Sequence, residues 1–214
     1  MLDLAWMLLA GYLLGSISGS LVLGRLRGVD IRAMGSGNAG GTNALRSVGW
    51  TFALAVVVID IGKGAVAAGL LPLLPTLFGQ ALPLPRASVG ALCGLASVLG
   101  HVWPVFFGFR GGKGAGTAVG VVAVVAPWCI VPLVMIWLVT LLGSGYVGLA
   151  TVLAGIGLVP SMWLLGPSPL PPALGVLALA FAALLVFTHR GNLARLRDGT
   201  ENRFERARVL KRRR

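Results

Sequence analysis

A glycine-rich segment at residues 35–46 gathers the residue types that bind phosphate groups. Glycines let backbone amides approach an anion without obstruction by a Cβ atom. Hydroxyl and amide side chains add neutral donors, and an arginine adds a planar pair of donors that fits phosphate. A flexible turn is the alternative interpretation, since glycine and asparagine also favour turns. The candidate phosphate ligands in this segment are Ser36, Gly37, Asn38, Gly40, Thr42, Asn43 and Arg46.

A second glycine-rich segment, residues 109–117, carries a lysine directly before an apolar run. If that run is a helix, its first amides and its dipole favour an anion at this segment. The sequence does not support an NTP-binding loop, because Phe107 stands where such a loop needs its first glycine. A positively charged anchor at the membrane edge is the alternative interpretation. The candidate ligands are Gly111, Gly112, Lys113 and Gly114.

Two further groups of polar residues could take part in chemistry. Asp60 and Lys63 lie three positions apart in an apolar run, so on a helix they share a face and can pair. That pattern fits a structural ion pair and an active-site role equally well. At the end of the last apolar run, His189 and Asn192 are followed by Glu201. A histidine at a membrane boundary is suited to act as a general base or as a phosphate donor.

Several common catalytic patterns are missing from the sequence. It contains no Gly-x-Ser-x-Gly motif and no cluster with zinc-ligand spacing, so we expect no metal site and no covalent serine intermediate. Cys93 and Cys129 lie inside apolar runs, which is typical of small core residues. His101, which precedes a Trp-Pro pair by one residue, is expected to have a structural role.

The elements that must position these residues are membrane helices. Hydrophobic residues make up 57% of the 214 residues and charged residues 11%, a composition that leaves too little polar surface for a soluble domain. The first apolar run lacks a basic start and a cleavage site, so we expect a retained membrane span and not a signal peptide. The runs long enough to cross a bilayer fall at residues 2–24, 50–72, 87–107, 114–143, 146–166 and 172–189.

The run at residues 114–143 is longer than one span requires. As a single helix it would measure about 45 Å against a hydrocarbon core of about 30 Å. Pro127 and Pro132 can break it into two spans or kink it. The basic segments after the first and third runs and the basic tail share one side only if it is two spans. The sequence therefore predicts an all-α polytopic membrane protein with about seven transmembrane helices, the N-terminus outside and the C-terminus cytoplasmic.

The net charge of +12 sits in short segments between the apolar runs and in the tail. This distribution indicates contact with anionic membrane lipids and argues against nucleic-acid binding. We expect one transmembrane domain, residues 1–189, and a basic cytoplasmic tail, residues 190–214.

Four motifs in this order resemble the bacterial acyl-phosphate:glycerol-3-phosphate acyltransferases of the PlsY type. The resemblance covers nearly the whole chain. It is carried by residues 29–32 with 35–46, 60–64, 100–104 with 111–114, and 189–192 with 195–196 and 199–201.

The resemblance implies a seven-helix enzyme of the bacterial inner membrane with a cytoplasm-facing site and no cofactor. It implies direct transfer of an acyl chain from acyl phosphate to the 1-hydroxyl of glycerol 3-phosphate, without an acyl-enzyme. The products are lysophosphatidic acid and phosphate, in the first step of phospholipid synthesis. The implied partners are acyl phosphate, glycerol 3-phosphate and membrane lipids, with the enzyme that makes acyl phosphate as a candidate.

On this hypothesis the two glycine-rich segments hold the substrate phosphates. Lys113, His189, Asn192 and Ser36 are the catalytic candidates, and Asp60, Lys63 and Glu201 are supporting candidates. The hydroxyl proton goes to His189 or to the phosphate itself. The chain departs from the family at Gly148, where the family usually has serine and Ser144 is a possible substitute, and at Gly191, where it often has glutamate. A small-anion transporter and a structural membrane scaffold are the alternatives to an enzyme.

Overall fold

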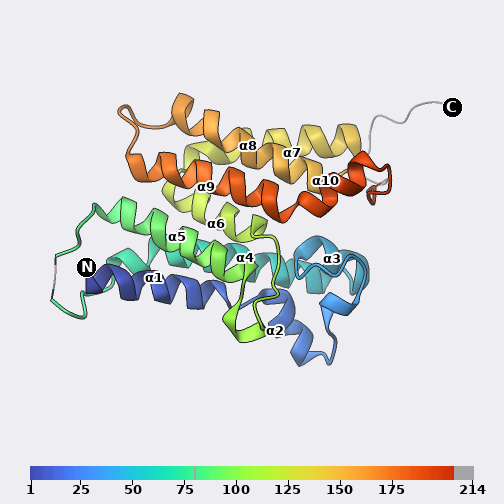
Figure 1. Cartoon of the computed structure of the whole chain (residues 1–214), viewed down its shortest axis with the longest axis horizontal. Coiled ribbons are helices and arrows are strands. Elements are labelled where there is room, and N and C mark those ends of the chain that lie inside the picture. Colours follow the sequence, from blue (N-terminus) through green and yellow to red (C-terminus); the bar gives the residue numbers. More distant parts are fainter. Residues whose placement is uncertain (80, 205–214) are drawn as a thin grey trace. The chain divides into compact units, whose positions relative to one another are not determined.

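The computed structural model describes residues 1–79 and 81–204. All regular secondary structure in these ranges is helical, which confirms the all-α prediction. Four helices are long and apolar enough to cross a membrane, or up to six if each of two bent pairs is one span. The predicted seven spans and the sidedness of the termini stay predictions. The chain forms two compact units, Met1–Pro127 and Trp128–Arg214 (Figure 1).

In the first unit, α4 packs against several neighbours, including α1, α2, α5 and α6. Glycines permit close helix packing: a Cβ atom on Gly11 would lie 2.7 Å from the carbonyl oxygen of Cys93, and one on Gly15 would collide with that of Ser97. The elements are α1 (Leu2–Gly15), α2 (Gly19–Leu26), η1 (Ile31–Ala33), α3 (Gly41–Ser47), α4 (Trp50–Gly69), η2 (Leu71–Leu73), α5 (Arg86–Val102), η3 (Val105–Phe107) and α6 (Ala115–Val125).

The first predicted span, residues 2–24, is broken in the structure. Helix α1 ends at Gly15 and α2 begins at Gly19, with a bend of 48° between their axes. A break inside a membrane segment frees backbone groups that lipid cannot satisfy. Side chains of α4 satisfy three of them, because Lys63 donates to two carbonyl oxygens at the break and Asp60 accepts from the amide of Gly19.

The long apolar run at residues 114–143 is also broken, as its proline content predicts. Helix α6 ends at Val125, the 3-10 turn η4 (Pro127–Cys129) follows, and α7 begins at Ile130. The division between the two compact units falls in the same turn, after Pro127. Helix α6 has 11 residues and is shorter than the four candidate spans.

In the second unit, α8 (Val147–Leu165) packs against both α7 (Ile130–Ser144) and α9 (Pro172–Thr188). Helix α9 continues, after a bend of 54°, into the short α10 (Arg190–Arg197). The first residues of the predicted tail are thus helical, while residues 205–214 lie outside the described residues. The predicted division into a domain at 1–189 and a tail at 190–214 stays a prediction.

Candidate active site

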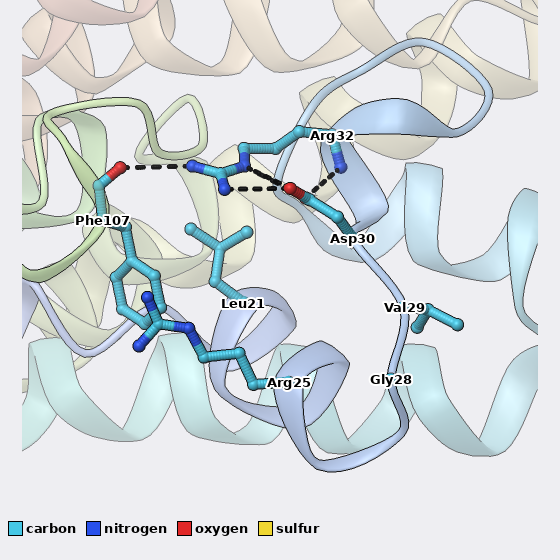
Figure 2. Close-up of a pocket in the computed structure, with 7 residues that line it drawn as sticks. All are labelled: Leu21, Arg25, Gly28, Val29, Asp30, Arg32 and Phe107. Carbon is cyan, nitrogen blue, oxygen red and sulfur yellow. Dashed lines mark hydrogen bonds and ion pairs between the residues drawn. The ribbon is translucent and has the colours of Figure 1, made fainter.

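Arg32, in the turn before the first glycine-rich segment, connects that segment to the second one. Its guanidinium pairs with Asp30, at 2.9 Å between Nη2 and Oδ2, and donates to the carbonyl oxygen of Phe107 at 3.1 Å (Figure 2). A longer bond of 3.4 Å reaches the carbonyl oxygen of Arg110. The hydrogen bonds from Arg32 hold the pKa of the Asp30 carboxyl below its ordinary value. The pair therefore works as a clamp between residues 30–32 and 107–110.

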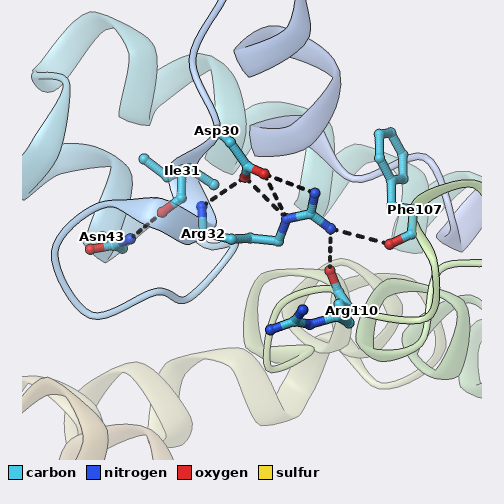
Figure 3. Close-up of polar contacts among 6 residues, drawn as sticks. All are labelled: Asp30, Ile31, Arg32, Asn43, Phe107 and Arg110. Carbon is cyan, nitrogen blue, oxygen red and sulfur yellow. Dashed lines mark hydrogen bonds and ion pairs between the residues drawn. The ribbon is translucent and has the colours of Figure 1, made fainter.

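The first glycine-rich segment is folded around the buried side chain of Asn43 in α3. Its amide nitrogen donates to the carbonyl oxygen of Ile31 at 3.1 Å (Figure 3) and to that of Met34 at 2.9 Å. Its carbonyl oxygen accepts from the backbone amide of Ser36 at 2.9 Å. Sequence reasoning placed Asn43 among the phosphate ligands, but its amide is engaged within the segment. A supporting role fits these contacts better.

The glycines of the first segment shape the chain around Asn43. Gly35 and Gly37 have φ angles of +54° and +71°, a left-handed conformation that favours glycine. A Cβ atom on Gly35 would also collide with the Asn43 carbonyl oxygen. The side chains of Ser36 and Arg46 are left exposed, whereas Asn38 and Thr42 are half-buried.

The two glycine-rich segments meet at Gly112. A Cβ atom there would collide with Nε2 of His101 and would lie 2.7 Å from the carbonyl oxygen of Ala39. This close approach supplies a reason for glycine that differs from the predicted one, which was access for an anion. The amides of Gly111 and Gly112 donate to the carbonyl oxygens of Val102 and His101, at 3.2 and 3.1 Å. These two amides are therefore bonded to α5, and the Lys113 ammonium is the candidate anion donor of this segment.

Next to Gly112 lies a cluster of three buried polar side chains, Asp60 and Lys63 of α4 and His101 of α5. Lys63 Nζ is 3.0 Å from Asp60 Oδ1 and 2.9 Å from His101 Nδ1, and it donates to the carbonyl oxygens of Gly15 and Ile17. Sequence reasoning left the Asp60–Lys63 pair open between structure and catalysis. The hydrogen bonds of Lys63 and Asp60 with backbone groups at the α1–α2 break favour a structural role. His101, expected to be structural, links this cluster to Gly112.

In the second unit, the predicted residues gather around the start of α10. His189 Nδ1 lies 2.8 Å from the carbonyl oxygen of Leu185, which can only accept, so Nδ1 carries the proton and Nε2 has the lone pair in the neutral ring. Glu201 accepts from Asn192 at 2.6 Å and from Arg195 at 2.8 Å. Its carboxylate thus orients the Asn192 amide.

The family departure at Gly148 has a steric consequence. A Cβ atom at this position would lie 2.9 Å from the Cβ atom of Asn192, so a serine would require one of the two to shift. Ser144, considered as a substitute, donates to the carbonyl oxygen of Thr140 at 2.7 Å and accepts from the amide of Tyr146 at 3.1 Å. Its hydroxyl is thus tied to its own turn.

The structure groups the predicted residues within each unit. Ser36, Arg46 and Lys113 belong to joined segments of the first unit, and His189, Asn192 and Glu201 belong to one end of the second. Their contacts with substrates stay predictions. Residues 1–79 and 81–204 contain no group of His, Cys, Asp or Glu that could hold a metal ion. The clamp residue Arg32 was missed as a site element, although its position two residues after an aspartate and just before the glycines was visible.

Apolar helices long enough to cross a membrane, together with joined glycine-rich segments bearing exposed Arg46 and half-buried Lys113, are typical of a membrane protein that binds phosphorylated ligands. The family model described as glycerol-3-phosphate acyltransferase matches residues 5–199, and the chain belongs to this family. It is thus a membrane-bound glycerol-3-phosphate acyltransferase, and a multi-pass protein of the bacterial inner membrane.

Relatives of the same description support this assignment along nearly the whole chain. The glycerol-3-phosphate acyltransferase of Geotalea daltonii is 40% identical, with 94% of this chain and 97% of the relative covered. That of Aquifex aeolicus is 38% identical, with 93% and 98% covered. The crystal structure of PlsY, an integral membrane glycerol 3-phosphate acyltransferase, in its glycerol 3-phosphate form has a TM-score of 0.82 and 38% identity, covering 94% of this chain and 95% of that one.

Proposed function

We propose that this acyltransferase takes its acyl chain from acyl phosphate and transfers it directly to the 1-hydroxyl of glycerol 3-phosphate. The hydroxyl oxygen bonds to the acyl carbon, and the bond from that carbon to the phosphate oxygen breaks. The electron pair leaves with the phosphate, and the hydroxyl proton passes to a base or to the phosphate. The products are lysophosphatidic acid and inorganic phosphate. Because acyl phosphate is already activated, no acyl-enzyme is needed.

The junction of the two glycine-rich segments carries this proposal. The Arg32 clamp and the contact of Gly112 with Ala39 hold together the segments that bear Arg46 and Lys113. Both substrates present a phosphate, and such a pair of segments offers charged and neutral phosphate donors on one unit. A related PlsY crystal structure is the lysophosphatidic acid form, which supports the proposed product.

Each residue of the first unit then has a chemical role. Ser36 and Arg46 hold a substrate phosphate, with Asn38, Gly40 and Thr42 as further donors. Lys113 stabilises the charge that develops on the acyl carbonyl oxygen and on the leaving phosphate. Asn43 supports the segment that presents them.

The residues of the second unit act on the hydroxyl in this proposal. His189 offers Nε2 as the base, which its bond from Nδ1 to the Leu185 carbonyl supports. Asn192 orients the hydroxyl, and Glu201 fixes the Asn192 amide. Membrane lipids surround the enzyme, and the enzyme that makes acyl phosphate supplies the donor.

The test is to mix the purified protein with acyl phosphate and glycerol 3-phosphate and to measure lysophosphatidic acid and phosphate. Acyl-CoA and acyl carrier protein thioesters serve as donor controls, and we expect product from acyl phosphate alone. Protein incubated with acyl phosphate in the absence of glycerol 3-phosphate should show no added acyl mass. Equal use of a thioester would contradict the proposed donor, and a stable acyl adduct would contradict direct transfer.

Substitutions test the proposed residues. Lys113→Ala and Arg46→Ala should each lower turnover by about 10²–10³-fold, the usual loss when one charge-stabilising donor is removed. Arg86→Ala, at the start of α5, is the matched control and should keep normal activity. Undiminished phosphate release by Lys113→Ala would remove that residue from the mechanism.

A further inference from the structure

A polar cavity is lined in part by the Asp30–Arg32 clamp and by none of the proposed substrate ligands. Its volume is about 350 Å³, within the range of small-ligand sites. It is lined by residues of α2, of the turn that follows α2, of η1 and of η3: Leu21, Arg25, Gly28, Val29, Asp30, Arg32 and Phe107 (Figure 2).

The charges of this cavity do not cancel. Asp30 and Arg32 pair with each other, and Nη1 of Arg32 donates to the backbone carbonyl oxygens of Phe107 and Arg110. Arg25 is exposed, and its guanidinium makes no hydrogen bond or ion pair with another residue in the described ranges. The cavity therefore keeps one positive charge and a full set of guanidinium donors.

Arg25 is held in position by an aromatic ring. Its guanidinium carbon lies 4.3 Å from the centre of the Phe107 ring, and Figure 2 shows the two groups stacked. Stacking leaves the N–H edge of the guanidinium available while it limits the movement of the side chain. A fixed planar donor is well suited to a phosphate, because less side-chain entropy is lost on binding.

The other side of the cavity is apolar. Leu21 and Phe107 form a buried wall, and two apolar neighbours of the lining residues are exposed: Leu26, which follows Arg25, at 79%, and Phe106, which precedes Phe107, at 51%. A free phosphate would leave this surface in water. A ligand with a phosphate and hydrocarbon chains would cover it, which favours a lipid at the membrane surface.

We propose that this cavity binds the phosphate headgroup of an anionic glycerophospholipid, at a site separate from the one that binds the substrates. Arg25 contacts the lipid phosphate, and the exposed side chains of Leu26 and Phe106 contact the first carbons of its chains. The inference does not rest on the identity of the acyl donor. Arg27 gives a matched comparison, since it stacks on Phe52 at 5.3 Å and does not line the cavity.

The test measures binding of short-chain phosphatidylglycerol to the full chain in detergent by native mass spectrometry, with phosphatidylcholine as the neutral control. We expect preferential phosphatidylglycerol binding that Arg25→Ala weakens at least tenfold, that Arg25→Lys weakens less, and that Arg27→Ala changes less than twofold. Equal losses in Arg25→Ala and Arg27→Ala would overturn the site, because nonspecific charge attraction would then suffice.

A competition arm separates a lipid from a free phosphate. Millimolar inorganic phosphate or glycerol 3-phosphate should leave phosphatidylglycerol bound, because neither covers the exposed apolar side chains of Leu26 and Phe106. Displacement by inorganic phosphate would overturn the lipid assignment. Unchanged thermal unfolding of Arg25→Ala would show that the loss of binding is not a loss of fold.

Discussion

Two aspartate–cation pairs of the first unit have nearly the same contact distance and opposite surroundings. Lys63 and Asp60 are 3.0 Å apart with side chains 3% and 5% exposed, whereas Arg32 and Asp30 are 2.9 Å apart with side chains 29% and 50% exposed. Both pairs also bind backbone groups of another segment. Because the contact distances are nearly equal, any difference between the two pairs in their contribution to stability comes from burial rather than from the contact itself.

The buried pair compensates for a broken helix. Lys63 binds carbonyls at the end of α1, and Asp60 binds the Gly19 amide at the start of α2. A cation at a helix C-terminus and an anion at an N-terminus also match the helix dipoles. Lipid cannot replace these hydrogen bonds, so both charged side chains are required to satisfy the backbone groups at the break.

The exposed pair connects two loops. Its carboxylate and guanidinium are accessible to water, so the ion pair alone adds little to stability. Its contribution is positional, because Arg32 ties residues 107–110 to the turn before the first glycine-rich segment. We therefore expect stability to depend on the buried pair and substrate binding to depend on the exposed one.

The largest expected effect comes from Lys63→Ala. It leaves Asp60 buried without its ammonium partner and frees two carbonyls, which should cost about 3–5 kcal/mol of unfolding free energy. The measurement is unfolding in detergent. The control is Arg197→Ala, from a 3.2 Å pair with Asp198 whose side chains are 82% and 55% exposed, where little change is expected. Equal stability of the two variants would refute the distinction between buried and exposed pairs.

Gly112→Ala tests the link between the buried cluster and the glycine-rich segments. The added methyl group must displace His101 or Ala39, which we expect to cost about 1–3 kcal/mol of stability and to lower activity. Gly62→Ala, on α4 with nothing within 4 Å of its Cβ position, is the matched control and should be neutral or stabilising. If both variants kept full activity, the contact at Gly112 would have no role in positioning the site.

Arg32→Ala should separate binding from stability. Its unfolding free energy should fall by about 1 kcal/mol or less, as for an exposed pair. The KM for glycerol 3-phosphate should rise about tenfold, equivalent to about 1.4 kcal/mol, because the two segments are no longer clamped. Arg32→Lys keeps the charge without the planar pair of donors and should restore only part of the affinity. The measurement is steady-state kinetics, with Arg27→Ala as the control. An unchanged KM for glycerol 3-phosphate in Arg32→Ala would contradict the role of the clamp.

The smallest effect concerns pH. Hydrogen bonds from Arg32 hold the pKa of Asp30 below its ordinary value of 3.8. A carboxyl with a depressed folded pKa adds stability above its unfolded pKa and loses it as pH falls through the folded pKa. The stability difference between the wild type and Asp30→Asn should thus be present at about pH 6 and should shrink below about pH 4. Unfolding midpoints across that range measure it, and a difference that grew on acidification would show the wrong sign.

Much of the fold could be predicted from local patterns. The apolar runs gave the helices, and Pro127 marked the break before α7. The break between α1 and α2 was not predicted, because the glycines and serines at residues 15–19 are small residues that membrane helices also use for close packing. Its stabilising partners are on α4, which no local pattern at the break can reveal.

The candidate site was predicted in residue types more than in roles. The two glycine-rich segments were found, and the structure joins them. Asn43 has the right chemistry for a phosphate ligand, yet its amide is used inside the segment. Position 112 requires glycine because a Cβ atom there would collide with the His101 ring and lie 2.7 Å from the Ala39 carbonyl oxygen. Such assignments depend on neighbours distant in sequence.

The sequence by itself determined that this chain forms membrane helices, since long apolar runs can satisfy their backbone only as helices. It also determined that Asp60 and Lys63 share a face, because three residues make almost one helical turn. Only the tertiary structure decided what the pair stabilises and which loops Arg32 connects. Those contacts span 41 to 78 residues of chain, so helix packing, rather than any local pattern, brings their atoms together.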